Sequence, residues 1–268
     1  MTASGIKQSL IGLLAIATVF AGIVGAQHAQ ALTDLDDVSS GSLIRGETFS
    51  AVYYMGADGF RYVFPNSNTY FTWYDDFDDV VWISDSDLAT IQIGGNVTYK
   101  PGVYMLKIQS SPTTYVVDEG GVLRAVDSEE TATALYGSAW NTMIHDVPDS
   151  FFSNYSIGDE LTSADDFDPA TAEASVDSIN DNKGLEAPEE IDITSSGYDP
   201  IDIEIEAGQV VRFTNNDDEK HSVTADDLSW GSGTMQPGGE YVHRFKEAGT
   251  YTFFDSYDSS NTGAIYVD

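Results

Sequence analysis

Apolar and polar residues alternate strictly along IDIEIE at residues 201–206, and a period of two is the pattern of a half-buried β-strand. Further short apolar stretches predict strands at 210–214, 241–245 and 250–254. The turn signals that separate the strands are clusters of Gly, Pro and Asn: Ala207-Gly208, Asn215-Asn216, Pro237-Gly238-Gly239 and Ala248-Gly249. Closely spaced short strands with such turns predict a small all-β sandwich over residues 191–268.

Residues 43–160 follow a different pattern, which is rich in aromatics and repeats itself at an offset of 62 to 64 residues. VYYMGADGFRYVFPNSNTYFTWY (52–74) is echoed by TYVVDEGGVLRAVDSEETATALY (114–136), and ISDSDLATIQIGG (83–95) is echoed by VPDSFFSNYSIGD (147–159). Self-similarity at a fixed period indicates duplication of one supersecondary unit. We therefore expect two copies, at about 43–100 and 101–160.

Each copy is expected to be a small α+β unit made of a β-hairpin and helices. Its two apolar runs flank Asp58-Gly59 or Gly120-Gly121, and tight hairpin turns prefer such dipeptides because they need positive φ. In the second copy, Asp127 followed by Glu130 predicts a helix cap. A further short helix is expected to begin near Ser84 and, in the second copy, near Pro148.

The segments outside these domains carry targeting and linker signals. Lys7, the apolar run 10–26 and Ala29-Gln30-Ala31 have the layout of a signal peptide, so residues 1–31 are expected to be a signal peptide or an uncleaved N-terminal anchor. Residues 32–42 read as a polar tether. Residues 161–190 hold few large apolar side chains and many acids, which predicts a disordered acidic linker.

Composition narrows the range of functions. The chain has 44 acidic and 11 basic residues and a net charge of −33, which excludes nucleic-acid binding through phosphates because that needs Lys and Arg. Anionic membrane surfaces are disfavoured for the same reason. The chain has no cysteine, so disulfides, zinc–thiolate sites, iron–sulfur clusters and thiol catalysis are excluded.

The C-terminal segments GYDPIDIEIEAGQVVRFTNNDDEKHSVTA, GTMQPGGEYVHRFKEAGTYTFF and TGAIYVD occur in that order. Together they resemble a short cupredoxin, most closely the cupredoxin-like domains grouped with periplasmic iron-uptake proteins (EfeO-type), over about residues 191–268. The resemblance implies a Greek-key β-sandwich. The repeats of the N-terminal half resemble uncharacterised tandem modules of exported bacterial surface proteins.

In copper-binding cupredoxins the resemblance places the first His ligand at His221, and the Cys, His and Met ligands at Asp255, Asp258 and Asn261. A type 1 blue-copper centre is excluded, because its defining bond is a copper–thiolate bond. Two interpretations stay open. In one, His221, Asp255 and Asp258, with Asn261 as the candidate fourth position, hold Cu(II) or another divalent metal. In the other, His221 only caps the sandwich and the aspartates form a solvated turn.

Other chemical candidates are weaker. His243 is expected to pack in the sandwich, His145 has no partner at metal spacing, and His28 belongs to the signal segment. DDFDD (75–79) and SDSD (84–87) lack the Gly and Glu of a calcium loop. The sequence carries no catalytic motif, so neither an enzyme nor a catalytic residue is expected. The aromatics of the repeats either build the cores of small modules or form a glycan platform: Tyr53, Tyr54, Tyr62, Phe64, Tyr70, Phe71, Trp73, Tyr74, Trp82 and Trp140.

The sequence thus predicts an exported, non-enzymatic protein of the cell envelope or surface, periplasmic or extracellular, whose cupredoxin-like domain is a binding or structural module. One alternative is a copper- or iron-binding protein that uses the His/Asp site. The other is a glycan-binding surface protein. The expected partners are cell-surface components, glycans or metal ions. Nucleic acid is not among them, and neither is a membrane apart from the N-terminal anchor.

Overall fold

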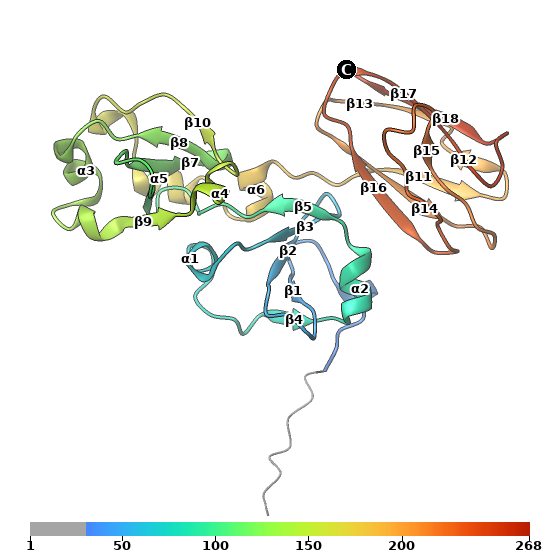
Figure 1. The fold of residues 1–268 in the computed structure, drawn as a ribbon, viewed down its shortest axis with the longest axis horizontal. Coiled ribbons are helices and arrows are strands. Elements are labelled where there is room, and N and C mark those ends of the chain that lie inside the picture. The colour runs from blue at the N-terminus through green and yellow to red at the C-terminus, as the bar shows by residue number, and fades with distance from the viewer. Residues whose placement is uncertain (1–30) are drawn as a thin grey trace, which may run out of the picture. The chain divides into compact units, whose positions relative to one another are not determined.

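The computed structural model describes residues 31–268 (Figure 1). The predicted signal peptide or anchor and His28 therefore lie outside the described residues. Within residues 31–268, no helix has both the length and the apolar character needed to span a bilayer. The described chain is mostly β-strands with short helices, so the predicted class of two α+β units followed by an all-β sandwich is confirmed.

The first unit is built around a five-stranded sheet in the order β4-β1-β2-β3-β5. Strands β1 to β3 pair antiparallel, and the outer strands β4 and β5 pair parallel to β1 and β3. The elements of this unit are η1 (Leu35–Asp37), β1 (Leu43–Arg45), β2 (Tyr53–Met55), β3 (Arg61–Val63), α1 (Ser67–Tyr70), β4 (Val80–Trp82), α2 (Asp85–Thr90) and β5 (Ile93–Asn96).

The second unit repeats this topology with a sheet in the order β10-β8-β7-β6-β9. Its elements are β6 (Met105–Ile108), β7 (Tyr115–Asp118), η2 (Glu119–Gly121), β8 (Val122–Ala125), α3 (Glu129–Tyr136), η3 (Trp140–Met143), β9 (Ile144–Val147), α4 (Asp149–Phe152) and β10 (Ser156–Ile157). The hairpin register is also repeated: Leu43 pairs with Tyr54, and Met105 pairs with Val116, each 62 residues later. The offset in the sequence is thus an offset between equivalent strands.

Local sequence explains most turns and helix starts in these units. Gly59, Gly120 and Gly121 have φ between 71° and 81°, the positive values that the predicted hairpin turns require. Helix α2 begins after Ser84, whose hydroxyl accepts from the backbone N–H of Asp87. The predicted cap at Asp127 is wrong by one residue: Ser128 caps α3.

The predicted polar tether and the predicted disordered linker both pack against the domains. In residues 32–42, Leu35 and Val38 pack on the cluster of Ile44, Ile83 and Ile91. Residues 161–190, predicted to be a disordered linker, instead form η4 (Ala164–Asp166), α5 (Pro169–Ala174) and α6 (Ile179–Lys183). The correction has a physical reason, because the few apolar side chains are spaced to reach neighbouring cores. The buried ones are Leu161, Phe167, Ala172, Val176 and Ile179.

The C-terminal part is a two-sheet β-sandwich, drawn from yellow-orange to red in Figure 1. One sheet has the order β12-β11-β14-β16 and the other β13-β18-β17-β15. The strands are β11 (Glu189–Thr194), β12 (Gly197–Asp199), β13 (Asp202–Ile205), β14 (Val210–Asn215), β15 (Thr224–Ala225), β16 (Glu240–Arg244), β17 (Gly249–Phe254) and β18 (Thr262–Val267). The alternation predicted for residues 201–206 is present, since Asp202 and Glu204 are exposed and Ile205 is buried in β13.

The sandwich core draws on both sheets. Val211 and Phe213 of β14, Phe253 of β17 and Ile265 of β18 are all fully buried in one cluster. Phe213 and Phe253 meet edge to face, with 5.4 Å between ring centroids. The core fixes the positions of the loops at the sandwich end, and those loops carry the candidate site.

A polar contact joins the first unit to the sandwich. The Asp58 carboxylate, which is 1% exposed, accepts from the Tyr62 hydroxyl at 2.6 Å and from the Arg244 guanidinium of β16. The side-chain oxygen of Gln92 accepts from the backbone N–H of Val242 at 2.9 Å. This contact covers part of the edge strand β16.

Candidate functional site

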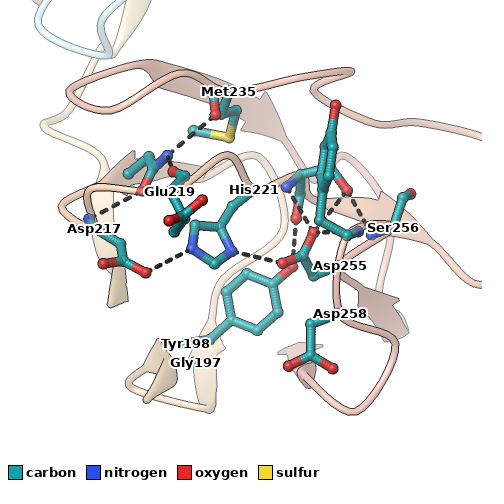
Figure 2. A network of polar contacts seen from close by, with 12 residues as sticks. Gly197, Tyr198, Asp217, Glu219, His221, Met235, Asp255, Ser256 and Asp258 are labelled. Atoms are coloured by element: carbon teal, nitrogen blue, oxygen red, sulfur yellow. Dashed lines mark hydrogen bonds and ion pairs between the residues drawn. The ribbon is translucent and has the colours of Figure 1, made fainter. Parts of the chain in front are cut away.

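His221 lies at the end of the sandwich with both ring nitrogens hydrogen-bonded to carboxylates (Figure 2). Its Nδ1 is 2.7 Å from Oδ2 of Asp255, and its Nε2 is 3.0 Å from Oδ2 of Asp217. The backbone N–H and carbonyl of His221 form a pair of hydrogen bonds with the carbonyl and N–H of Met235. This isolated β-bridge fixes the backbone that carries the ring. The imidazole is therefore held between two acids, and only 7% of the residue is exposed.

Asp255 follows β17 directly and is fully buried. Its Oδ1 accepts from the backbone N–H of Ser222 at 2.9 Å, from the Ser222 hydroxyl at 3.2 Å and from the backbone N–H of Tyr257 at 3.0 Å. Its Oδ2 accepts from His221. Because a buried carboxylate is stable only when it is fully hydrogen-bonded, these four donors explain how an acid tolerates this position.

Asp217 is held by the loop that follows β14. The Asn215 side chain, which is fully buried, donates to the carbonyl oxygens of Glu219 and Met235 and accepts from the backbone N–H of Asp217 at 3.0 Å. These bonds fold residues 216–220 so that the Asp217 carboxylate reaches the ring of His221, four residues later. The side-chain pair is partly open to solvent on this side.

Asp258 and Asn261 are arranged differently. The Oδ1 of Asp258 accepts from the hydroxyl of Ser260 at 2.6 Å and from its backbone N–H at 3.0 Å, and in Figure 2 no dashed line joins Asp258 to His221. The backbone of Asn261 closes the loop through bonds with Asp255 and Asp258. The Asn261 side chain lies over Gly197, where an added Cβ would be 2.8 Å from its Oδ1.

The acids determine the protonation of the histidine. Burial alone would lower the pKa of His221, but the hydrogen bonds to Asp255 and Asp217 and their negative charges outweigh it, so the pKa of His221 is raised. The hydrogen bond from His221 in turn lowers the pKa of Asp217. Both effects favour an imidazolium that donates to two carboxylates.

Of the predicted metal ligands, the structure brings His221 and Asp255 into contact and leaves Asp258 and Asn261 outside that contact. The two carboxylates that touch the ring do so through different nitrogens, so they lie on opposite sides of it. In residues 31–268, no group of three or more His, Cys, Asp or Glu side chains has the arrangement of a metal site. A metal at His221 would have to displace one of the acids.

The other described histidines pack against aromatic rings. His243 stacks on Trp230 at 4.6 Å, and its Nδ1 is 3.3 Å from the Tyr241 hydroxyl. His145 stacks on Tyr104 at 4.1 Å. Burial lowers the pKa of both histidines.

The tryptophan side chains of the repeats are half-buried and contact other groups of the chain. The indole N–H of Trp73 donates to the carbonyl of Thr98 at 2.9 Å. The guanidinium of Arg45 lies 3.8 Å from the ring centroid of Trp82, and Trp140 packs on the core of the second unit. Each of these three tryptophans is therefore only partly accessible to a ligand.

The acidic stretches of the first unit accept hydrogen bonds from other groups of the chain. Asp85 of the SDSD stretch accepts from the backbone of Glu47 and from the backbone and hydroxyl of Thr48, and so ties α2 to a loop that is distant along the chain. In the DDFDD stretch, the Asp76 carboxylate accepts from the backbone N–H of Asp78, which is a local turn contact.

Sequence reasoning missed Asp217, Asn215 and Ser222. Asp217 could have been found from its spacing, since it precedes His221 by four residues inside the turn NNDDEKH. Asn215 and Ser222 gave no signal in the sequence, because their roles depend on how the loops fold: Asn215 bonds to backbone groups of Asp217, Glu219 and Met235, and Ser222 bonds to the carboxylate of Asp255, which lies 33 residues later.

Comparison with known proteins agrees with this fold. The family model of a cupredoxin-like domain matches residues 171–267, so this part of the chain is a cupredoxin-like domain. The match begins ahead of the predicted boundary at residue 191, inside α5, and takes in α6. No curated protein matches the chain.

Solved structures with a similar fold include a purple cupredoxin from Nitrosopumilus maritimus, at 24% identity over 30% of this chain and 99% of that one, with a TM-score of 0.29. A Cu(I) form of an amicyanin mutant is 23% identical over 30% of this chain and 82% of its own, also with a TM-score of 0.29. A reduced amicyanin mutant at pH 4 is 22% identical over 31% and 85%, with the same TM-score. The family match, rather than these likenesses, supports the domain assignment.

Proposed function

We propose that the protein is an exported, non-enzymatic component of the cell envelope or surface, and that its cupredoxin-like domain is a copper-free binding and structural module. The observation that carries the proposal is the Asp217–His221–Asp255 bridge, in which protein groups use both ring nitrogens. An apolar run before Ala29-Gln30-Ala31 supports export. The likeness to EfeO-type domains and to tandem surface modules points to the same compartment.

The structural role of the bridge follows from what it joins. Asp217 and His221 both belong to the loop that connects β14 to β15, and Asp255 belongs to the loop after β17. The bridge therefore braces the β14–β15 loop, which passes from one sheet to the other, and ties it to the loop after β17 at one end of the sandwich. In a copper-binding cupredoxin a metal ion would join the corresponding loops, and here charge-assisted hydrogen bonds take that place.

The rival proposal is a copper- or iron-binding protein that uses His221, Asp255 and Asp258, with Asn261 as the fourth position. One observation favours it: the charge of His221 contributes to the lowered pKa of Asp258, after its two hydrogen bonds from Ser260. The exposed Asp258 carboxylate is thus near the ring and open to solvent. A small movement of the 255–261 loop would bring it toward a metal at the imidazole.

Thermal unfolding of the purified protein during titration with Cu(II), Fe(III) or Zn(II) distinguishes the copper-free module from the metal-binding protein. Our proposal predicts an unchanged midpoint once the ionic strength is matched with Mg²⁺, which controls for diffuse attraction to an acidic protein. A metal protein would gain about 2.7 kcal/mol of stability at a free metal concentration of about 100 Kd. That gain would disappear in His221→Ala and persist in the control variant His243→Ala, and such a result would refute the copper-free module.

A further inference from the structure

The first unit carries a groove that the site at His221 does not involve. It has a volume of about 510 Å³. Its apolar lining comes from the residues just before β2 and just after β3, from α1 and the loop that follows α1, and from α4 of the second unit: Val52, Phe64, Pro65, Tyr70, Phe77 and Phe151. Asn66, Ser67 and Asn96 add polar groups to it. A volume of this size holds two or three amino-acid side chains.

The most exposed aromatic of the lining is Phe77, which is 48% exposed. The Tyr70 ring beneath it is 1% exposed and stacks on Phe77, with 4.4 Å between ring centroids. The Tyr70 hydroxyl donates to the carbonyl of Asp76 at 2.6 Å and so anchors the loop that carries Phe77. A phenyl ring held rigidly at the surface gives a partner a preorganised apolar contact.

Four acids surround Phe77: Asp75, Asp76, Asp78 and Asp79 are all exposed. Burial, together with the charges of Asp76 and Asp79, raises the pKa of Tyr70 to about 12, which places those charges near the floor of the groove. No Lys or Arg is among the lining residues. The groove is therefore apolar inside and negative around Phe77.

We propose that this groove binds an extended basic peptide segment of a partner protein, with an apolar side chain against Phe64, Tyr70 and Phe77 and with flanking Lys or Arg residues paired to the acids of residues 75–79. Charge complementarity selects a basic partner. A sugar is disfavoured because Phe77, the most exposed ring of the groove, has no hydrogen-bond donor or acceptor and the Tyr70 hydroxyl already donates to Asp76. The proposal concerns the first unit and stands apart from the metal question at His221.

The test is a selection of random displayed peptides of about twelve residues against the full chain, with a parallel selection against Phe77→Ser. The control variant Ile157→Ser removes an apolar side chain that is 61% exposed, from β10 of the second unit. We expect the selected peptides to combine an aromatic or aliphatic residue with Lys or Arg on both sides. Binding should weaken about tenfold or more in Phe77→Ser, equivalent to about 1.4 kcal/mol, and stay unchanged in Ile157→Ser.

The charge contribution is tested with the selected peptide. Asp78→Asn combined with Asp79→Asn should weaken binding several-fold, and the exposed pair Glu129→Gln and Glu130→Gln in α3 should not. Raising NaCl from about 50 mM to about 300 mM should weaken binding to the unaltered chain, because exposed charges are screened. The proposal fails if no peptide is enriched, if peptides bind Phe77→Ser equally well, or if a glycan array gives the only binding that depends on Phe77.

Discussion

The resemblance to copper-binding cupredoxins implies that Asp255 replaces their cysteine ligand, and in the structure its carboxylate accepts hydrogen bonds from three donors besides the histidine. A carboxylate cannot replace a thiolate in the electronic structure of a blue-copper centre. It can accept hydrogen bonds from an imidazolium and from backbone N–H groups, which a thiolate does less well. The residue change therefore favours an ionic bridge at the same place in the fold.

Replacing Asp255 by Ala should destabilise the domain by about 3 to 5 kcal/mol, because the variant leaves His221 and the N–H of Ser222 without their buried partner. Asp258→Ala is the matched control, since Asp258 is exposed and its side chain accepts hydrogen bonds from Ser260 alone. Its effect should stay within about 0.5 kcal/mol. Urea unfolding measures both, and equal losses in the two variants would contradict the assigned roles.

The raised pKa of His221 gives the domain a defined pH dependence. A histidine whose pKa is higher in the folded than in the unfolded state binds its proton more tightly when folded. Its contribution to stability is complete below the ordinary value of about 6.5 and is lost as the pH rises through the folded pKa.

The free energy of unfolding of the natural protein minus that of His221→Gln should therefore be larger at about pH 5.5 than at about pH 9. Denaturant unfolding in the presence of a chelator measures this difference. His243→Gln serves as the control and should change in the opposite sense, because burial lowers the pKa of His243. If the stability lost in His221→Gln were larger at high pH than at low pH, the result would contradict the bridge between His221 and the two acids.

At the scale of elements, sequence reasoning succeeded where one local pattern determined the outcome. The alternation at residues 201–206 and the turn glycines at Gly59, Gly120 and Gly121 predicted strands and hairpins that the structure contains. The repeat offset predicted equivalent strands, and the two sheets share one order. These features depend on neighbours along the chain, so the sequence displays them directly.

Elements that depend on distant partners were predicted poorly. Residues 161–190 have low average hydrophobicity, yet Leu161, Phe167 and Ile179 are buried by other parts of the chain. The candidate site shows the same limit. His221 and Asp255 could be paired through family resemblance, whereas Asp217 and Ser222 depend on how two loops fold around them.

The cap of α3 offers a test at this scale. The sequence contains two adjacent capping residues, and the structure assigns the role to Ser128, whose hydroxyl accepts from the backbone N–H of Thr131 at 3.2 Å. Ser128→Ala should cost about 1 kcal/mol and Asp127→Ala much less, as judged by thermal unfolding. A larger loss of stability in Asp127→Ala than in Ser128→Ala would contradict this assignment and would support Asp127, the cap predicted from the sequence.

The molecule as a whole carries a net charge of −33, so repulsion between acids opposes its compact state. Adding NaCl from about 50 mM to about 500 mM should raise the unfolding midpoint, because the screening length shortens well below about 10 Å. Choline chloride should act in the same way if screening is the cause. A midpoint that rises with only one of the two salts would indicate specific ion binding instead.

The central claim is that acids, and not a metal, hold the imidazole of His221. Its most direct test is an NMR spectrum of the full chain labelled with ¹⁵N-histidine, recorded near neutral pH before and after equimolar diamagnetic Zn(II). We predict that both ring nitrogens of His221 are protonated and hydrogen-bonded, and that their signals do not change with Zn(II). Loss of one ring proton with a large shift of that nitrogen on metal addition would contradict the claim.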